Sequence, residues 1–340
     1  MVNYDPIKYF EELYTKERIY SFKAQSIEEW KIWREELRSK IKDLLGGFPE
    51  KIDLNSEILE KKEFNEYIRE KIVFDSHKNI KVLGYLLIPK NLDFPKPAVI
   101  AVPGHGYGKD DIVGINIDGT ERVIPTGYQK DFALTLVREG FITLAVEQLG
   151  FGERRLKEDM NKDKNKSSCR KLFFWGLMLG KPLLGIRVWD LIRAIDYLQE
   201  RKEVKRDSIG IMGISGGGTT SLFVSALDDR IRATVISGYL NTFKDSILSI
   251  SHCECNYIPG ILNYAEMYDI ASLIAPRYLF IEHGIYDNIF PISATKFSLE
   301  KIKKVYEFLG VSDNIQWEFF EGGHEIWGNK SIKWLKEKLV

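Results

Sequence analysis

The chain has 340 residues, 44% of them hydrophobic and 29% charged, which is ordinary for a globular protein. Its formal net charge is zero, so the charge points to neither nucleic acid nor an anionic membrane as a partner. No apolar run reaches the length of a membrane span, and the N-terminus lacks a basic segment followed by an apolar core. Three cysteines argue against a disulfide framework, so we expect a cytoplasmic protein without membrane contact.

The first part of the chain predicts a helix and then antiparallel strands. Apolar residues recur at helical spacing over residues 26–45, and Ser26 with Glu29 predicts a capping box at the start. Three strand-like runs follow, at residues 58–64, 66–74 and 80–88. We therefore expect residues 1–56 to form a helical extension packed on the main body.

From residue 98 onward, strands and helices alternate. The expected strands cover residues 98–102, 141–146, 209–212, 233–236, 278–281 and 315–320. The expected helices cover residues 129–138, 186–198, 293–309 and 331–339. Such alternation predicts an α/β fold with a mostly parallel central sheet and helices on both faces. Residues 57–340 then form one domain, entered through the antiparallel strands.

Two long segments interrupt the alternation, at residues 150–185 and 239–268. Because connections in compact domains are short, segments of this length are typical of lids or binding loops. Both carry aromatic residues, and we expect them to form one wall over the reactive centre, with Trp175 and Tyr257 contacting the substrate. The alternative is that these aromatics only fill gaps between helices.

The chain is organised around Gly213-Ile214-Ser215-Gly216-Gly217, between an expected strand and an expected helix. The spacing G-x-S-x-G in this context is typical of a nucleophile elbow, a sharp turn that exposes a serine at a helix N-terminus. Such a turn strains the serine backbone, to a positive φ, and leaves no room for side chains two residues away. A glycine-rich phosphate loop is the alternative, but no Lys follows in the G-K-[ST] pattern.

A nucleophilic serine of this kind needs an acid and then a histidine further along the chain. His324 follows an expected strand on a glycine-rich loop, where ligands bind in open α/β sheets. Asp287 follows another strand end and is the preferred acid, with Glu282 and Asp269 as weaker alternatives. His283 is interpreted as a structural residue that fixes the loop of Asp287.

The N–H groups of Gly216 and Tyr107 are the expected oxyanion donors, because the glycines of residues 103–108 allow a close approach of the backbone. His105 in that loop precedes Ser215 and is interpreted as shaping the loop. His252, Cys253 and Cys255 lack the spacing and the further ligands of a zinc site, so we expect neither a metal nor a cofactor. Cys169 receives no role.

The chain resembles the α/β-hydrolase superfamily, and within it the dienelactone hydrolase and acetyl xylan esterase-like branch. The similar stretches are residues 103–107, 213–217, 275–277, 283–287 and 322–324. The resemblance implies an α/β-hydrolase fold, a catalytic triad of Ser215, Asp287 and His324, and an oxyanion hole at Gly216 and Tyr107. Dienelactone hydrolases typically have Cys where this chain has Ser215, and one group of acetyl esterases has Gln where it has Gly216.

These observations together predict a serine carboxylic-ester hydrolase that acts through an acyl-enzyme on short-chain acyl esters, with acetylated carbohydrates among the candidates. Its expected partner is a small-molecule ester substrate, and the sequence leaves a homo-oligomer open. Two alternatives stay open: a serine peptidase of the same fold that acts on short peptides, and a non-catalytic binding protein on a hydrolase scaffold.

Overall fold

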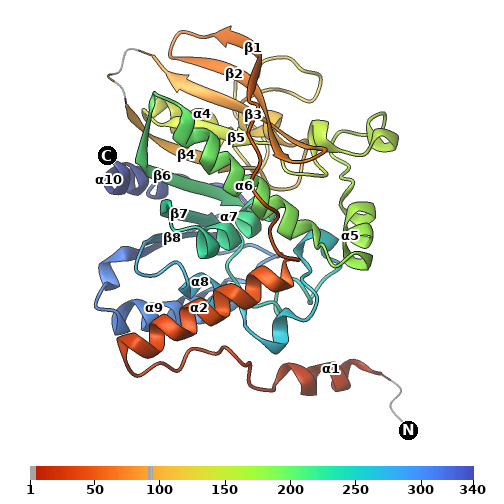
Figure 1. Cartoon of the computed structure of the whole chain (residues 1–340), viewed down its shortest axis with the longest axis vertical. Coiled ribbons are helices and arrows are strands. Elements are labelled where there is room, and N and C mark those ends of the chain that lie inside the picture. Colours follow the sequence, from red (N-terminus) through yellow and green to blue (C-terminus); the bar gives the residue numbers. More distant parts are fainter. Residues whose placement is uncertain (1–4, 91–92, 94) are drawn as a thin grey trace.

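A single nine-stranded sheet forms the centre of the protein (Figure 1). A computed structural model describes residues 5–90, 93 and 95–340; residues 1–4 of the expected extension lie outside this part. The strands lie in the order β1-β2-β3-β5-β4-β6-β7-β8-β9. The pairs β1·β2, β2·β3 and β3·β5 are antiparallel, and all pairs from β5 to β9 are parallel. The predicted antiparallel entry into a mostly parallel sheet is confirmed.

The strands are β1 (Glu57–Glu63), β2 (Tyr67–His77), β3 (Ile80–Pro89), β4 (Lys96–Val102), β5 (Ile142–Val146), β6 (Val204–Ile214), β7 (Ile231–Ser237), β8 (Tyr278–Gly284) and β9 (Ile315–Phe320). The α-helices are α1 (Ile7–Tyr14), α2 (Ile27–Leu44), α3 (Lys109–Ile112), α4 (Phe132–Arg138), α5 (Cys169–Met178), α6 (Leu183–Glu200), α7 (Gly216–Leu227), α8 (Met267–Ser272), α9 (Ile292–Phe308) and α10 (Ser331–Leu339). Short 3₁₀ helices are η1 (Gly152–Arg154), η2 (Lys157–Asp159), η3 (Glu254–Asn256), η4 (Ile261–Asn263) and η5 (Ser312–Asn314).

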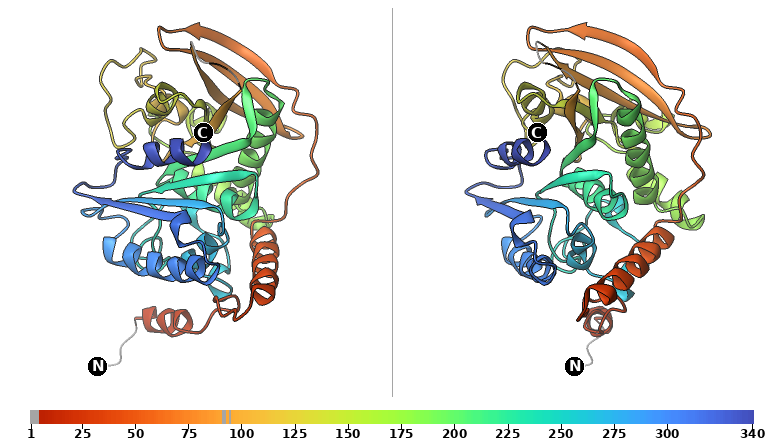
Figure 2. Two further views of the ribbon diagram at one scale, coloured as in Figure 1. Left: turned by 90° about the vertical axis from the view of Figure 1, so that its left-hand side faces the viewer. Right: turned by 60° about the vertical axis from the view of Figure 1, so that its left-hand side comes forward.

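Helices cover both faces of the sheet (Figure 2). One apolar cluster packs α2, α6, α7, α8 and α9 on one face, and a second packs α4 and α10 on the other. The strands between them are buried on both sides, which is why the sequence shows nearly continuous apolar runs there. Helix α2 buries Trp33, Leu37 and Ile41 in the first cluster, and the Ser26 Oγ accepts the N–H of Glu29 at 3.2 Å.

The structure differs from the predicted elements in several places. Helix α4 begins at Phe132 and not at residue 129, because Lys130 and Asp131 have positive φ angles of 48° and 51° that a helix cannot include. Helix α1 was not predicted, and none of its residues is buried. The first long insertion contains another unpredicted helix, α5, where only an aromatic run was recognised.

In the described part of the chain, no single helix is long and apolar enough to cross a bilayer. Helices α5 and α6 pass that test only together, as a pair bent by 100°.

The order of the strands locates the functional edge of the sheet. Strand β4 lies between β5 and β6. The chain runs from β4 to β5 on one side of it, and the next strand, β6, pairs with its other side. Ligands in such sheets bind at this reversal, outside the carboxyl ends of the strands. The loop after β4 and the turn after β6 meet at this point, and the turn after β6 carries Ser215.

Candidate active site

Ser215 lies on the turn between β6 and α7. Its φ is 55° and its ψ is −124°, a strained conformation that the elbow interpretation predicted. Two backbone hydrogen bonds hold the turn: the N–H of Ser215 donates to the oxygen of Ser237 at 3.1 Å, and the N–H of Thr219 donates to the oxygen of Ser215 at 2.9 Å. Neither bond uses the Ser215 hydroxyl, so the fold itself does not require it.

The glycines that flank the serine are required by space. A Cβ at Gly213 would collide with the backbone of Gly217, and one at Gly217 would collide with the backbone of Val102 at the end of β4. The predicted crowding of the turn is thus confirmed. It also brings the first N–H groups of α7 beside Ser215, and the first turn of a helix has no intrahelical acceptors for these groups.

A histidine and a carboxylate from two different loops meet at the same edge. The Nδ1 of His324, on the loop after β9, lies 2.7 Å from the Oδ2 of Asp287, on the loop after β8. The Oδ1 of Asp287 accepts the N–H groups of Ile289 at 2.8 Å and Phe290 at 3.0 Å, which leaves Oδ2 directed at the imidazole. Burial alone would raise the pKa of Asp287, but the hydrogen bond and charge of His324 outweigh it and lower that pKa.

Two aromatic rings hold His324 in position. Tyr128 stacks on the imidazole with centroids 5.5 Å apart, and Phe290 stacks with centroids 5.6 Å apart. The His324 Cε1 lies over Gly238, where a Cβ would come within 3.3 Å of it. Gly238 directly follows Ser237, the residue that binds the N–H of Ser215, so the imidazole and the serine lie beside the same short stretch of chain. No sequence pattern had singled out Tyr128, Phe290 or Gly238.

The weaker acid candidates have other structural partners. The carboxylate of Glu282 is fully buried and accepts four hydrogen bonds, from Ser237 Oγ at 2.9 Å, Trp327 N at 3.0 Å, Gly328 N at 2.8 Å and Ser331 Oγ at 2.6 Å. Asp269 caps α8 by accepting the N–H of Glu266 at 2.9 Å. Asp287 is therefore the carboxylate that contacts His324.

His283 spans the loop of Asp287, as its structural interpretation predicted. Its Nε2 donates to the oxygen of Phe290 at 2.7 Å, and the same Nε2 lies 4.0 Å from the Oδ2 of Asp287. Burial lowers the pKa of His283 and so favours its neutral ring.

The loop after β4 approaches Ser215 through Gly104. A Cβ there would collide with the Tyr128 hydroxyl and would lie 3.1 Å from the Ser215 Cβ, so only glycine fits this close approach. Two buried glutamines position the loop: Gln129 Oε1 accepts the N–H of Gly104 at 2.8 Å, and Gln148 Nε2 donates to the oxygen of Pro103 at 2.6 Å. The hydroxyl of Tyr128 donates to the oxygen of His105 at 2.6 Å, which ties the loop to the residue that stacks on His324.

Tyr107, the other expected oxyanion donor, directs its side chain away from this contact. Its hydroxyl donates to the oxygen of Ile115 at 3.1 Å and accepts a hydrogen bond from Arg122. The phenol therefore has a structural role, and only the backbone N–H of Tyr107 is left for a role at the oxyanion. The N–H of His105, which directly follows Gly104, is a further candidate that the sequence did not single out.

The two long insertions pack against each other. Phe173 and Tyr257 approach with centroids 6.5 Å apart, and Arg170 forms an ion pair with Glu254 at 2.5 Å. Asn256 reaches the elbow helix, where its Oδ1 accepts the hydroxyl of Thr219 at 2.7 Å. The two insertions thus share one wall beside the first turns of α7.

The residues expected to bind substrate differ in their surroundings. Trp175 is 65% exposed, whereas Phe173 two residues earlier is buried. Tyr257 donates its hydroxyl to the oxygen of Ile247 at 3.0 Å and lines a pocket of about 140 Å³ beside Phe243 and Ile261. The lining of that pocket does not include Ser215, Asp287 or His324. Substrate contact by Trp175 and Tyr257 stays a prediction.

A pair of substitutions tests the role of Trp175. We expect Trp175→Ala to change the ratio of acetyl to butyryl ester turnover and to alter the free energy of unfolding by no more than about 0.5 kcal/mol, because the ring is exposed. Phe173→Ala should lower that free energy by roughly 3–5 kcal/mol, because it removes a buried ring. Urea denaturation and ester hydrolysis measure the two effects. An unchanged chain-length ratio in Trp175→Ala would remove Trp175 from the substrate site.

One step of the sequence argument missed two residues that the fold brings together. The expectation of no metal rested on the absence of further ligands around His252, Cys253 and Cys255, but the fold places His105 and Cys169 beside the two cysteines. His252, by contrast, lies apart from this group, with its Nδ1 3.1 Å from the Nδ2 of Asn256. No spacing could reveal the group, because its members come from three distant segments.

The sheet order, the strained serine between β6 and α7, and the paired Asp287 and His324 define an α/β-hydrolase fold. The chain belongs to the Abhydrolase family described as Abhydrolase_7, whose model matches residues 11–322. It is 29% identical over 286 residues to the Bacillus subtilis (strain 168) protein named "Putative hydrolase YtaP", covering 82% of this chain and 90% of that one.

Solved structures show the same fold at lower identity. One is described as a "putative acetyl xylan esterase" from Bacteroides fragilis NCTC 9343; it has a TM-score of 0.80 and 20% identity, and the match covers 94% of this chain and 83% of that one. Another is a glucuronoyl esterase from Solibacter usitatus, with a TM-score of 0.70 and 16% identity, covering 93% of this chain and 95% of that one.

Proposed function

We propose that this protein is a serine carboxylic-ester hydrolase that acts through an acyl-enzyme on short-chain acyl esters, with acetylated carbohydrates as the leading substrate class. The observation that carries the proposal is the strained Ser215 at the start of α7, together with a His324 at the same sheet edge whose Nδ1 is held 2.7 Å from Asp287. A binding protein would have no need of a strained serine and an oriented imidazole at one sheet edge.

In this mechanism, the Oγ of Ser215 attacks the ester carbonyl while the Nε2 of His324 takes its proton. Asp287 keeps the His324 Nδ1 protonated and stabilises the imidazolium that forms. Collapse of the tetrahedral intermediate expels the alcohol, which receives the proton from His324. Water then attacks the acyl-enzyme, again with His324 as the base, and releases the acid.

The negative charge of the tetrahedral intermediate needs donors that are already in place. The N–H of Gly216 lies at the start of α7, where the helix dipole favours an anion. The loop after β4 supplies the second donor, either from Tyr107, as the sequence predicted, or from His105, which follows the glycine in contact with Ser215. Gln129 and Gln148 fix this loop, so the donor needs no reorganisation during the reaction.

The choice of ester over peptide is supported by the relatives. The two solved structures are described as esterases, one for acetyl groups on xylan and one for glucuronoyl esters. Both descriptions name esters of carbohydrates, and an acetyl group also suits an active site walled by two packed insertions. A sugar acetate is therefore the first substrate to test.

Two measurements test the proposal. A fluorophosphonate probe should label Ser215 in the wild-type protein, and the label should be absent from Ser215→Ala. Initial rates on an aryl acetate, an acetylated xylo-oligosaccharide, a methyl glucuronate ester and a peptide anilide should then be highest on an acetyl ester. Faster cleavage of the anilide would identify a peptidase, and an unlabelled serine without turnover would identify a binding protein.

A further inference from the structure

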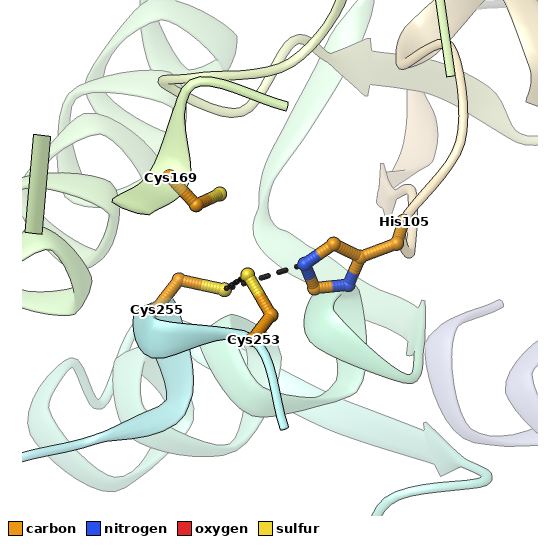
Figure 3. A group of neighbouring side chains, drawn as sticks. All are labelled: His105, Cys169, Cys253 and Cys255. Carbon is orange, nitrogen blue, oxygen red and sulfur yellow. Dashed lines mark hydrogen bonds between the residues drawn. The ribbon is translucent and has the colours of Figure 1, made fainter. Parts of the chain in front are cut away.

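Four side chains able to bind a metal meet beside the elbow (Figure 3). They are His105, Cys169, Cys253 and Cys255, and their ligand atoms all lie within 4.8 Å of one another. His105 lies on the loop after β4, and Cys169 is the first residue of α5. Cys253 directly precedes η3, and Cys255 is the second residue of η3. The chain has only three cysteines, and all three are in this group.

The spacing of the ligand atoms fits a tetrahedral zinc ion. Zinc binds thiolate sulfur at about 2.3 Å and imidazole nitrogen at about 2.0–2.1 Å, so a tetrahedron has S···S edges of about 3.8 Å and S···N edges of about 3.5 Å. The Sγ of Cys255 lies 3.4 Å from the Sγ of Cys253 and 3.5 Å from the Nε2 of His105. With no pair beyond 4.8 Å, side-chain movements of about 1 Å or less complete the tetrahedron.

The charge around the group supports a bound cation with thiolate ligands. Arg187 is 2% exposed; its guanidinium donates to the oxygen of Leu149 at 2.7 and 3.0 Å and to the Sγ of Cys169 at 3.1 Å. Within the described residues, no carboxylate forms an ion pair with Arg187. A buried cation without an anion is costly. Three thiolates, one neutral imidazole and Zn²⁺ carry a net charge of −1, which balances Arg187.

Simpler roles for the cysteines explain fewer of these contacts. All three are free, and a disulfide between Cys253 and Cys255 would close a ring over a single intervening residue and leave Cys169 and His105 unexplained. Packing alone accounts for buried thiols, because unpaired cysteines are often buried. Packing does not explain why the Nε2 of His105 is aimed at the sulfurs, or why Arg187, which pairs with no carboxylate among the described residues, contacts one of them.

We propose that His105, Cys169, Cys253 and Cys255 bind one Zn²⁺ ion in a closed, structural site. Four protein ligands fill the coordination sphere, so the ion has no open position for substrate. Binding releases the three thiol protons to solvent, and no bond forms or breaks except those to the metal. The ion would join the two insertions to the loop after β4.

At this position, a bound metal would hold the loop after β4 against the wall of the active site. The His105 ring lies against the first residue of α7, since a Cβ at Gly216 would come within 3.0 Å of the His105 Nδ1. His105 also follows Gly104, the glycine in contact with Ser215. A metal bound to the Nε2 of His105 would therefore fix the loop that faces the serine, although it takes no part in the chemistry.

The first test uses the full-length wild-type protein, expressed without a histidine tag and purified without chelators. We expect about one zinc ion per chain by mass spectrometry of the metal. Growth with cobalt should give thiolate-to-cobalt charge-transfer absorption of a tetrahedral site. A chelator should lower the Tm and make all three cysteines reactive toward a thiol reagent, and added Zn²⁺ should reverse both changes.

These wild-type measurements can overturn the proposal without any variant. A metal-free protein that takes up neither Zn²⁺ nor Co²⁺, or whose thiols react equally with and without Zn²⁺, would contradict the site. A disulfide among the three cysteines in freshly purified protein would do the same. None of these readouts depends on turnover, so they are independent of the proposed esterase activity.

A matched pair of variants locates the ligands. Cys253→Ser should reduce zinc content at least tenfold, whereas Glu254→Gln, one residue away, should retain it. Glu254 is a fair control because its side chain pairs with Arg170 and is not part of the group. Equal zinc content in the two variants would show that the metal binds elsewhere. If Cys253→Ser does not fold, the thiolate-to-cobalt absorption of the wild type still tests whether the cysteines bind the metal.

Discussion

Ser215→Ala is expected to lower kcat by roughly 10³-fold or more while the protein stays folded. The substitution removes the nucleophile but not the backbone hydrogen bonds that hold the elbow, which run from Ser215 N to Ser237 and from Thr219 N to Ser215 O. Alanine keeps the Cβ at the same positive φ, so the backbone strain is the same in both proteins. Kinetics on an aryl acetate measure the loss of kcat, and the Tm shows whether the protein stays folded.

Ser221→Ala is the matched control for this experiment. Ser221 lies on the same helix, α7, and its Oγ has no hydrogen-bond partner within the described residues. Removing that hydroxyl should leave both the turnover and the fold nearly unchanged. Wild-type turnover in a folded Ser215→Ala protein would contradict the covalent mechanism. A residual rate above that in water is compatible with it, because the oxyanion donors remain.

The parts of the fold that could be predicted depend on short-range patterns. The elbow was found because the strand, the two glycines and the helix are neighbours in sequence. The choice of Asp287 and His324 needed only their order along the chain and their positions after strand ends, because parallel strands end at one edge of the sheet. The structure places these two side chains 2.7 Å apart.

The parts that could not be predicted depend on how distant segments pack. Tyr128 and Phe290 enclose the His324 ring from two different loops, and neither residue has a neighbour in sequence that indicates this. The same is true of Cys169, which meets Cys253 and Cys255 only because the two long insertions pack together. The start of α4 was placed too early, because the left-handed backbone of Lys130 and Asp131 has no clear signature in residues of these types.

Asp287→Asn is expected to lower kcat by about 10⁴-fold, the loss that this change causes in serine proteases. The Oδ1 of Asp287 accepts two backbone N–H groups, so an asparagine here would keep its amide oxygen on that side. Its NH₂ would then face the His324 Nδ1, which would have to become an acceptor. The proton of the neutral ring would move to Nε2, and His324 could no longer take the proton of Ser215.

Glu282→Gln separates this effect from general damage to a buried carboxylate. Glu282 accepts four hydrogen bonds from donors around the His324 loop and makes none with His324 itself. The NH₂ of a glutamine cannot accept hydrogen bonds, so the N–H or O–H groups that face it would lose their acceptor. This loss should lower the free energy of unfolding by roughly 1–3 kcal/mol. The folded fraction should keep most of its kcat, whereas Asp287→Asn should lose kcat with a nearly unchanged Tm. If Glu282→Gln lowers kcat more than Asp287→Asn does, at a temperature where both variants are folded, the acid is Glu282 and not Asp287.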